Sequence, residues 1–487
     1  MSTAISARPS GLGRLTKTLF LARMRSGSQR WLAACTIVGF TITTWLALTV
    51  VAGVVMFIER YRHPAETYPV VFSLEPDMAK IMGALYVLFA LFACALMVVP
   101  IASLASTSAR LGANSTERRL AILRLIGLSS RDVERMTLME NAIITVIGIV
   151  LGVIAYAASV PLWQFASFQN QRLTSGEMLL PAVYIGLVGL AVLAIATISS
   201  WFGLQRVRIT PLGVARRSLP KPLKAWRLIA FVLAIAAYSV VLVVAKPSGT
   251  SQTEIFLYAV PVFVAMIIVI AVINLVVPWL LQIAVRILAH LPGAAWMRAM
   301  RRIAYDPRAV WRRISGLAMA AFIGGMTSAG DFAANSGAGS EQIPPAALKE
   351  LNALNPDIRF GVIIVIVIVC IVLGLQVIIQ SSSDVLEQAE TSQALVRMGA
   401  PRRFLSVSAW LENLLPVVVA LATAPIGWLL AQPQAAALER FTGREVSATP
   451  APLITVIVLG IGLTVCALIV VGPLRRQVST RYQRGND

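Results

Sequence analysis

The sequence predicts an all-α, polytopic membrane protein with about ten transmembrane helices, and three observations support this fold class. Of the 487 residues, 57% are hydrophobic and only 13% are charged, whereas a soluble domain carries roughly 25% charged residues. The apolar residues form runs long enough to cross a bilayer, which takes about 20 consecutive residues. The Lys and Arg residues gather in short segments between these runs. We therefore expect a chain whose surroundings are the lipid bilayer.

The predicted helices follow the apolar runs along the chain. They lie near residues 31–58, 79–106, 139–160, 181–204, 227–246, 257–285, 314–330, 359–381, 411–431 and 452–473. The sixth contains Pro261 and Pro278, which predict a kink or a tilt. The seventh is the weakest of the set, because it is short, rich in glycine and ends at Asp331. The first 30 residues lack the pattern of a cleaved signal peptide. We expect residues 11–28 to form a basic helix on the anionic inner leaflet, and a disordered basic tail is the alternative for residues 1–10.

The distribution of charge predicts the orientation of the chain. Most of the 42 Lys and Arg residues fall in the first 30 residues, in four segments and in the C-terminal tail; the segments are 108–136, 204–227, 287–313 and 382–408. The loops on the opposite side hold few basic and several acidic residues. Cytoplasmic loops carry this excess of Lys and Arg. Both termini are therefore predicted to be cytoplasmic.

The composition disfavours several classes of function. The net charge of +20 could suggest nucleic acid, but its confinement to loops favours the membrane, so no nucleic-acid partner is expected. The four cysteines lack the spacing of a metal or redox site, and the two histidines are isolated. Residues 11–18 resemble a phosphate-binding loop, but Thr16 stands where the motif requires glycine. We expect a non-catalytic chain without a metal or cofactor of its own.

An internal repeat links two distant parts of the chain. Residues 121–141 read AILRLIGLSSRDVERMTLMEN, and residues 394–413 read ALVRMGAPRRFLSVSAWLEN. One offset aligns Leu123 with Leu395, Gly127 with Gly399, Arg131 with Arg403, Glu140 with Glu412 and Asn141 with Asn413. The copies lie an even number of predicted helices apart, so both face the same side. The repeat predicts two parallel four-helix halves joined by two linking helices.

This repeat divides the chain into four parts. We expect a cytoplasmic basic segment at 1–30, a first four-helix half at 31–215, the linking helices 5 and 6 at 216–310, and a second four-helix half at 311–487.

Each copy of the repeat encodes a helix–turn–helix on the basic side. Gly127 and Gly399 suit the end of a short helix. Residues 129–132 match a capping box, and Pro401 suits the first turn of the next helix. Two basic, partly apolar elbows would suit the docking of a cytoplasmic protein. The alternative, ordinary short loops pinned to lipid headgroups by arginines, remains open at this point.

The first copy resembles a known family. Residues 118–133 read RRLAILRLIGLSSRDV and lead through Leu-Met-Glu into a helix with Gly148 and Gly152. This string is similar to FtsX-like permeases, the membrane subunits of MacB-type ABC systems. The second copy is similar but weaker, because it lacks those glycines. The duplicated ten-helix plan resembles the BceB-like branch, in which one chain does the work of a dimer. The large extracytoplasmic domain of such relatives is missing, because the loops at 59–78 and 331–358 are too short.

The resemblance implies a division of labour between this chain and its partners. Two copies of a separate ABC ATPase subunit would bind ATP and Mg, and residues 118–132 and 391–403 would touch them. The candidate coupling residues are Arg118, Arg119, Leu123, Arg124, Gly127, Ser129, Arg131, Asp132, Leu395, Arg397, Gly399, Arg402 and Arg403.

Polar pairs at the predicted helix starts are further candidates; they are Glu140, Asn141, Glu412 and Asn413. The glutamates suit either the helix dipole or ion pairs with cytoplasmic arginines. The asparagines suit hydrogen bonds between helices.

These observations favour one function and leave two alternatives. The favoured function is a permease subunit of a bacterial plasma (inner) membrane ABC transporter, which exports or extracts an amphipathic lipid, peptide or drug. The first alternative is an FtsX-like mechanotransmitter that regulates a cell-wall enzyme or a sensor kinase, with an extracytoplasmic protein as a further candidate partner. The second is a secondary carrier or lipid flippase without an ATPase. The absence of charged residues from the middles of the predicted helices disfavours an ion-driven carrier.

Overall fold

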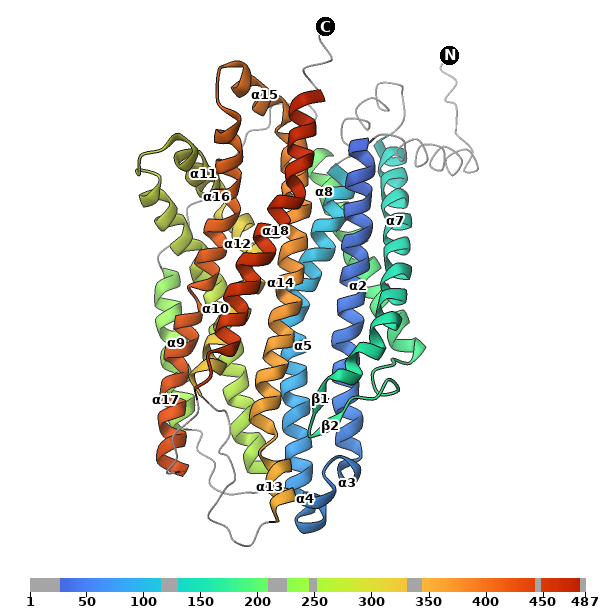
Figure 1. Cartoon of the computed structure of the whole chain (residues 1–487), viewed down its shortest axis with the longest axis vertical. Coiled ribbons are helices and arrows are strands. Elements are labelled where there is room, and N and C mark those ends of the chain that lie inside the picture. Colours follow the sequence, from blue (N-terminus) through green and yellow to red (C-terminus); the bar gives the residue numbers. More distant parts are fainter. Residues whose placement is uncertain are drawn as a thin grey trace.

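The computed structural model describes residues 27–114, 130–208, 226–244, 252–330, 344–442 and 448–481, and nearly all of them are helical (Figure 1). The long helices are α2 (Gly27–Arg62), α5 (Pro76–Asn114), α7 (Ser130–Ser159), α8 (Ala182–Arg208), α9 (Trp226–Val244), α10 (Gln252–Leu288), α12 (Pro307–Ala329), α14 (Leu354–Glu387), α16 (Arg402–Leu421), α17 (Ala424–Thr442) and α18 (Ala451–Arg481). The short elements are α3 (Pro64–Thr67), α4 (Pro69–Leu74), η1 (Val160–Phe165), β1 (Ser167–Phe168), β2 (Gln171–Arg172), α11 (Ala294–Tyr305), α13 (Pro345–Leu351) and α15 (Ala389–Arg397).

Eight helical segments of the described residues are long and apolar enough to cross a membrane. They confirm the all-α polytopic class. The two remaining predicted spans correspond to α9, which is apolar but shorter, and to α12. The predicted span 411–431 covers parts of α16 and α17, which are separated by a break at Ala422 and Thr423. Pro425 accounts for the break, since its ring nitrogen has no hydrogen to donate to the carbonyl of Leu421, four residues earlier.

Helix α12 is the central helix of the bundle. Every residue from 314 to 330 is buried, and α12 packs against α5, α10, α14, α16, α17 and α18. A helix enclosed by other helices needs little hydropathy, and small residues let the neighbouring backbones approach closely. Gly325 faces the carbonyl oxygen of Ala424, and Gly427 of α17 faces the carbonyl oxygen of Phe322. The low hydropathy of this segment therefore reflects its central position.

The two sets of four helices share one pattern of neighbours. In the first set α2 packs on α5, α7 and α8, and α5 and α7 both contact α8. In the second set α12 packs on α14, on the broken α16–α17 pair and on α18, and α14 and α16 both contact α18. The sets meet where α2 and α5 pack on α14 and where α5 packs on α12. Helices α9 and α10 pack together, and α10 also contacts α5 and α12.

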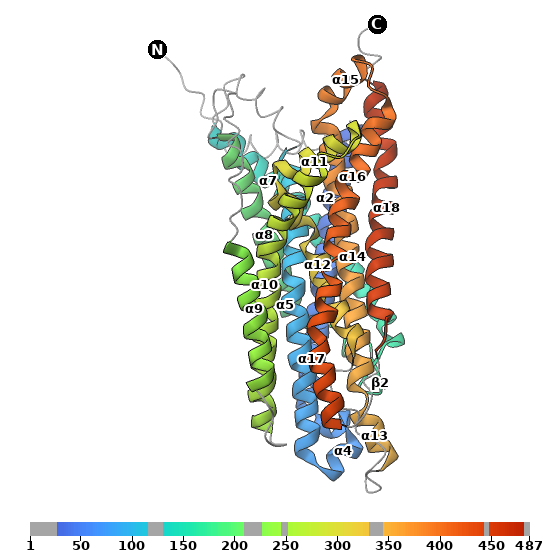
Figure 2. The same cartoon turned by 90° about the vertical axis from the view of Figure 1, so that its left-hand side faces the viewer.

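The bundle is elongated, and its two ends differ. Helices α11 and α15 lie at one end, and α4 and α13 lie at the other in both views (Figures 1 and 2). Helix α3 lies beside α4 in Figure 1. We call these the α15 end and the hairpin end, because the antiparallel β1–β2 hairpin belongs to the second. The long helices α5 and α14 connect the two ends.

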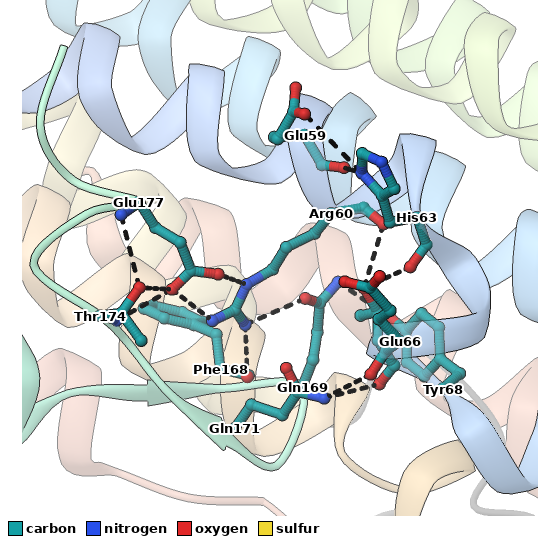
Figure 3. A network of polar contacts seen from close by, with 11 residues as sticks. Glu59, Arg60, His63, Glu66, Tyr68, Phe168, Gln169, Gln171, Thr174 and Glu177 are labelled. Carbon is teal, nitrogen blue, oxygen red and sulfur yellow. Dashed lines mark hydrogen bonds and ion pairs between the residues drawn. The ribbon is translucent and has the colours of Figure 1, made fainter.

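The hairpin is fixed by one buried arginine (Figure 3). Arg60, at the end of α2, donates to both carboxylate oxygens of Glu177 at 2.9 and 3.2 Å. It also donates to the carbonyl oxygen of Phe168 at 2.9 Å. Partial burial alone raises the pKa of Glu177, but hydrogen bonds from Arg60 and Thr174 outweigh it and lower the pKa below its ordinary value. The Glu177 carboxylate therefore stays charged and anchors the loop at neutral pH.

Candidate functional site

The second repeated segment forms the predicted helix–turn–helix at the α15 end. Helix α15 ends at Arg397, and Gly399, just after its C-cap Met398, has a φ of +88° that favours glycine. The amide of Ala400 donates to the carbonyl of Leu395, and the amide of Gly399 donates to that of Val396, both at 3.0 Å. These two bonds form the Schellman motif that ends many helices. Pro401 is the N-cap of α16, one residue before the position that its sequence suggests.

The tip of this elbow is open to its surroundings. Arg397, Gly399 and Arg403 are exposed, and Met398 is 75% exposed. Leu395 is partly buried. The remaining coupling candidates are placed less fully. Arg118, Arg119, Leu123, Arg124, Gly127 and Ser129 lie outside the described residues, Arg131 and Asp132 lie in the first turn of α7, and Arg402 begins α16.

An arginine on α11 joins the two helices that flank α15. Arg302 Nη1 lies 2.6 Å from Glu412 Oε2, and Arg302 Nη2 lies 3.1 Å from Asp384 Oδ1. Asp384 belongs to the last turn of α14, and Glu412 belongs to α16. Ser408 donates to the second oxygen of Glu412 at 3.0 Å. The side chain of Glu412 is only 10% exposed, so its charge depends on this partner.

Two further contacts of α11 lie on either side of α15, one at its N-cap and one in α16. With its amide oxygen turned toward α11, Gln388, the N-cap of α15, accepts from Arg302 Nη1 at 2.9 Å. The guanidinium of Arg298 lies 5.6 Å from the ring centroid of Phe404, in the first turn of α16, a distance that favours a cation–π contact. Arg298 and Arg302 are one turn apart on α11. This helix therefore grips the elbow on both sides of its exposed tip.

The polar pairs of the repeat are not at helix starts, contrary to expectation. The helices begin at Ser130 and Arg402, about three turns before Glu140 and Glu412. The helix dipole acts only over the first turn, so it does not account for either glutamate. Glu140 is buried, and Glu412 takes the expected alternative, an ion pair with an arginine.

The two asparagines differ from each other. Asn141 donates to the hydroxyl of Ser200 and so joins α7 to α8, as expected. Asn413 donates to the carbonyl of Ala409 in its own helix at 2.8 Å. The prediction of a hydrogen bond between helices is therefore wrong for this bond of Asn413, which stays within α16.

The internal repeat did not identify Arg302 or Asp384 as candidate functional residues. The repeat points to residues that agree between the copies, whereas Arg302 belongs to the linking region. One sequence signal could have found it: residues 294–305 have a strongly amphipathic pattern, with Arg298 and Arg302 four residues apart on one face.

Comparison with known proteins bears on the first set of helices. The family model "FtsX-like permease C-terminal" matches residues 90–212, which include the second part of α5, all of α7 and α8, and the first repeated segment. A comparison with curated proteins gives no match. Residues 90–212 thus match the FtsX-like permease C-terminal domain, and this match supports a membrane permease subunit of an ABC-type system.

Proposed function

We propose that this chain couples ATP hydrolysis by two copies of a separate ABC ATPase to export or extraction of an amphipathic lipid, peptide or drug. The two repeated segments, residues 391–403 of the elbow and residues 118–132, would contact the ATPase subunits. The observation that carries this proposal is the grip of Arg302 on both helices beside the exposed tip of α15. A contact that transmits force must be exposed at its tip and firmly anchored behind it.

The arrangement of helices supports two parallel units within one chain. The first unit would be α2, α5, α7 and α8, and the second would be α12, α14, α16–α17 and α18, with α9, α10 and α11 linking them. Their shared pattern of neighbours is what a duplication would produce. One chain would then offer two ATPase contacts, one from each unit.

The orientation follows from the charge at the α15 end. The exposed basic residues of this end include Arg301, Arg308, Arg312, Arg397 and Arg403. Cytoplasmic surfaces of membrane proteins carry such an excess. We infer that the α15 end lies in the cytoplasm of a bacterial cell, that the membrane is the plasma membrane, and that the hairpin end lies outside.

Helix α14 could transmit a displacement of the elbow from the α15 end to the hairpin end. It has 34 residues, which at 1.5 Å per residue is roughly 50 Å. One end lies beside α15, and the other lies beside α13 at the hairpin end. A push on the elbow would therefore move α14 and α16 together through Arg302, and α14 would carry the displacement across the bilayer. The same continuity suits a mechanotransmitter, the second candidate, in which an outer partner protein receives the motion.

Copurification with an ABC ATPase encoded beside the gene of this chain tests the proposal. We expect the tagged chain to retain the ATPase encoded beside its gene, and the double charge reversal Arg397→Glu with Arg403→Glu to reduce retention about tenfold or more. The control is Arg172→Glu, which reverses an exposed charge at the hairpin end. Full retention by the double variant would contradict the coupling assignment. Transport driven by an ion gradient without ATP would instead support a secondary carrier.

A further inference from the structure

Two carboxylates of α13 and α14 are held by the first set of helices at the hairpin end. Glu350 of α13 accepts from the backbone amides of Val70 and Val71 of α4 at 3.3 and 3.0 Å. Asp357 of α14 accepts from the hydroxyl of Tyr86 of α5 at 2.6 Å. Helix α4 lies between α2 and α5 in the chain, and α13 directly precedes α14. Both acids therefore bond across the boundary between the two sets.

The β-hairpin supplies the remaining cross-boundary bonds. The backbone amide of Gln169 donates to Asp357 at 2.6 Å, and the side chain of Asn170 donates to the carbonyl of Lys349 at 2.8 Å. Gln169 and Asn170 form the hairpin turn, with φ of +60° and +59°. The turn therefore reaches from the first set of helices to the second.

The hairpin turn is itself fixed to the first set (Figure 3). Gln169 is 2% exposed. Its side chain donates to the hydroxyl of Tyr68 at 2.9 Å and accepts from Arg60 at 3.2 Å. Backbone strain of this kind persists only where surrounding contacts hold it. The turn thus presents its amide to Asp357 from a rigid base.

Hydrogen bonds to the two carboxylates can form and break as the two sets of helices approach and separate. A hydrogen bond to a carboxylate is strong when its surroundings exclude water, and its net contribution falls when water can replace the partner. Apolar contacts beside it, of Tyr68, Val71 and Met82 with Leu354 and Ile358, exclude water from the closed form. Separation of the two sets would hydrate both acids and all of their donors together.

We propose that Glu350 and Asp357 form a latch that closes the hairpin end, and that the two sets of helices part at this end when the latch releases. All contacts of the latch are made by residues of this chain, so the latch can form without an ATPase. Its release by ATP rests on the proposed function, because α14 carries Asp357 at one end and Asp384, the partner of Arg302, at the other.

Distances between spin labels on the two sides test the latch in the purified chain. Ala65 of α3 and Ala346 of α13 are exposed and provide label sites after change to cysteine, in a background in which the four native cysteines are alanine. We expect the unmodified latch to give one short-distance population. Glu350→Gln combined with Asp357→Asn should increase the long-distance population severalfold.

A matched control removes two other carboxylates from the same end. Glu59→Gln combined with Asp77→Asn affects exposed acids whose ion pairs, with Arg62 and Lys80, stay within their own segments. This control should keep the distances of the parent. Tyr86→Phe, a milder variant that removes one donor to Asp357, should give an intermediate long-distance population without loss of folding. Unchanged distances in both the latch variant and Tyr86→Phe would overturn the proposal. The measurement uses no ATPase, so this result would leave the proposed coupling untouched.

Discussion

Replacing Arg302 with glutamate is expected to abolish stimulation of the ATPase by the permease while leaving the ATPase bound. The change removes the partner of Asp384 and Glu412 and places a third negative charge beside them. Breaking a fully buried ion pair costs about 3–5 kcal/mol, and this partly exposed pair is expected to cost roughly 1–3 kcal/mol. The elbow should then move without displacing α14 and α16. ATP hydrolysis by the complex in liposomes, together with copurification, measures both effects.

The neighbouring arginine provides the control for this variant. Arg301 lies on the same helix and is exposed, so Arg301→Glu makes the same change of charge without breaking the bridge. Arg302→Lys keeps the charge but lacks the fork that reaches two carboxylates, and it should lie between the parent and Arg302→Glu. Equal stimulation by the Arg301 and Arg302 variants would show that the bridge has no role in coupling.

A second large effect is expected from Gly427→Ala in α17. A Cβ at this position would fall on the carbonyl oxygen of Phe322, so the backbones of α12 and α17 must separate. Overpacking of this kind costs about 1–3 kcal/mol. Because α12 is the central helix, the loss should appear as a lower unfolding midpoint of the whole protein in mild detergent.

The same change at an open position should have the opposite or no effect. Gly462 of α18 is exposed, and a Cβ there would meet nothing within 4 Å. Alanine is the better helix former by about 0.5–1 kcal/mol, so Gly462→Ala should keep or slightly raise the midpoint. A midpoint for Gly427→Ala equal to that of Gly462→Ala would contradict the close packing of α12 and α17.

Apolar runs made most of the fold predictable, because a helix that faces lipid must be apolar along its length. Helix α12 shows where this rule weakens. Its neighbours are other helices, so glycine and alanine replace large apolar residues. The hydropathy of this segment is therefore low, although the helix lies at the centre of the bundle. The break between α16 and α17 was also not predictable from hydropathy, because the two helices form one apolar run in the sequence. At the break, Thr423 donates to the carbonyl of Ala318 of α12 at 2.7 Å.

The turn of the elbow was predictable because Gly399 and Pro401 act through local backbone geometry. The anchoring of the elbow was not, since Arg302 meets residues 82 and 110 positions further along the chain. The hairpin turn was missed for a related reason. Gln169 and Asn170 lack the glycine that usually marks such a turn, and long-range hydrogen bonds of Gln169 with Arg60 and Tyr68 hold the turn in place.

Photo-crosslinking from the tip of the elbow tests the central claim most directly. A photoreactive amino acid at Met398, which is 75% exposed at the α15 end, should crosslink to the copurifying ATPase. The same group at Phe165, which is 90% exposed near the hairpin, should give no such product. A crosslink from Met398 alone is the result that the account predicts. Absence of that product from a complex that still contains the ATPase would contradict it.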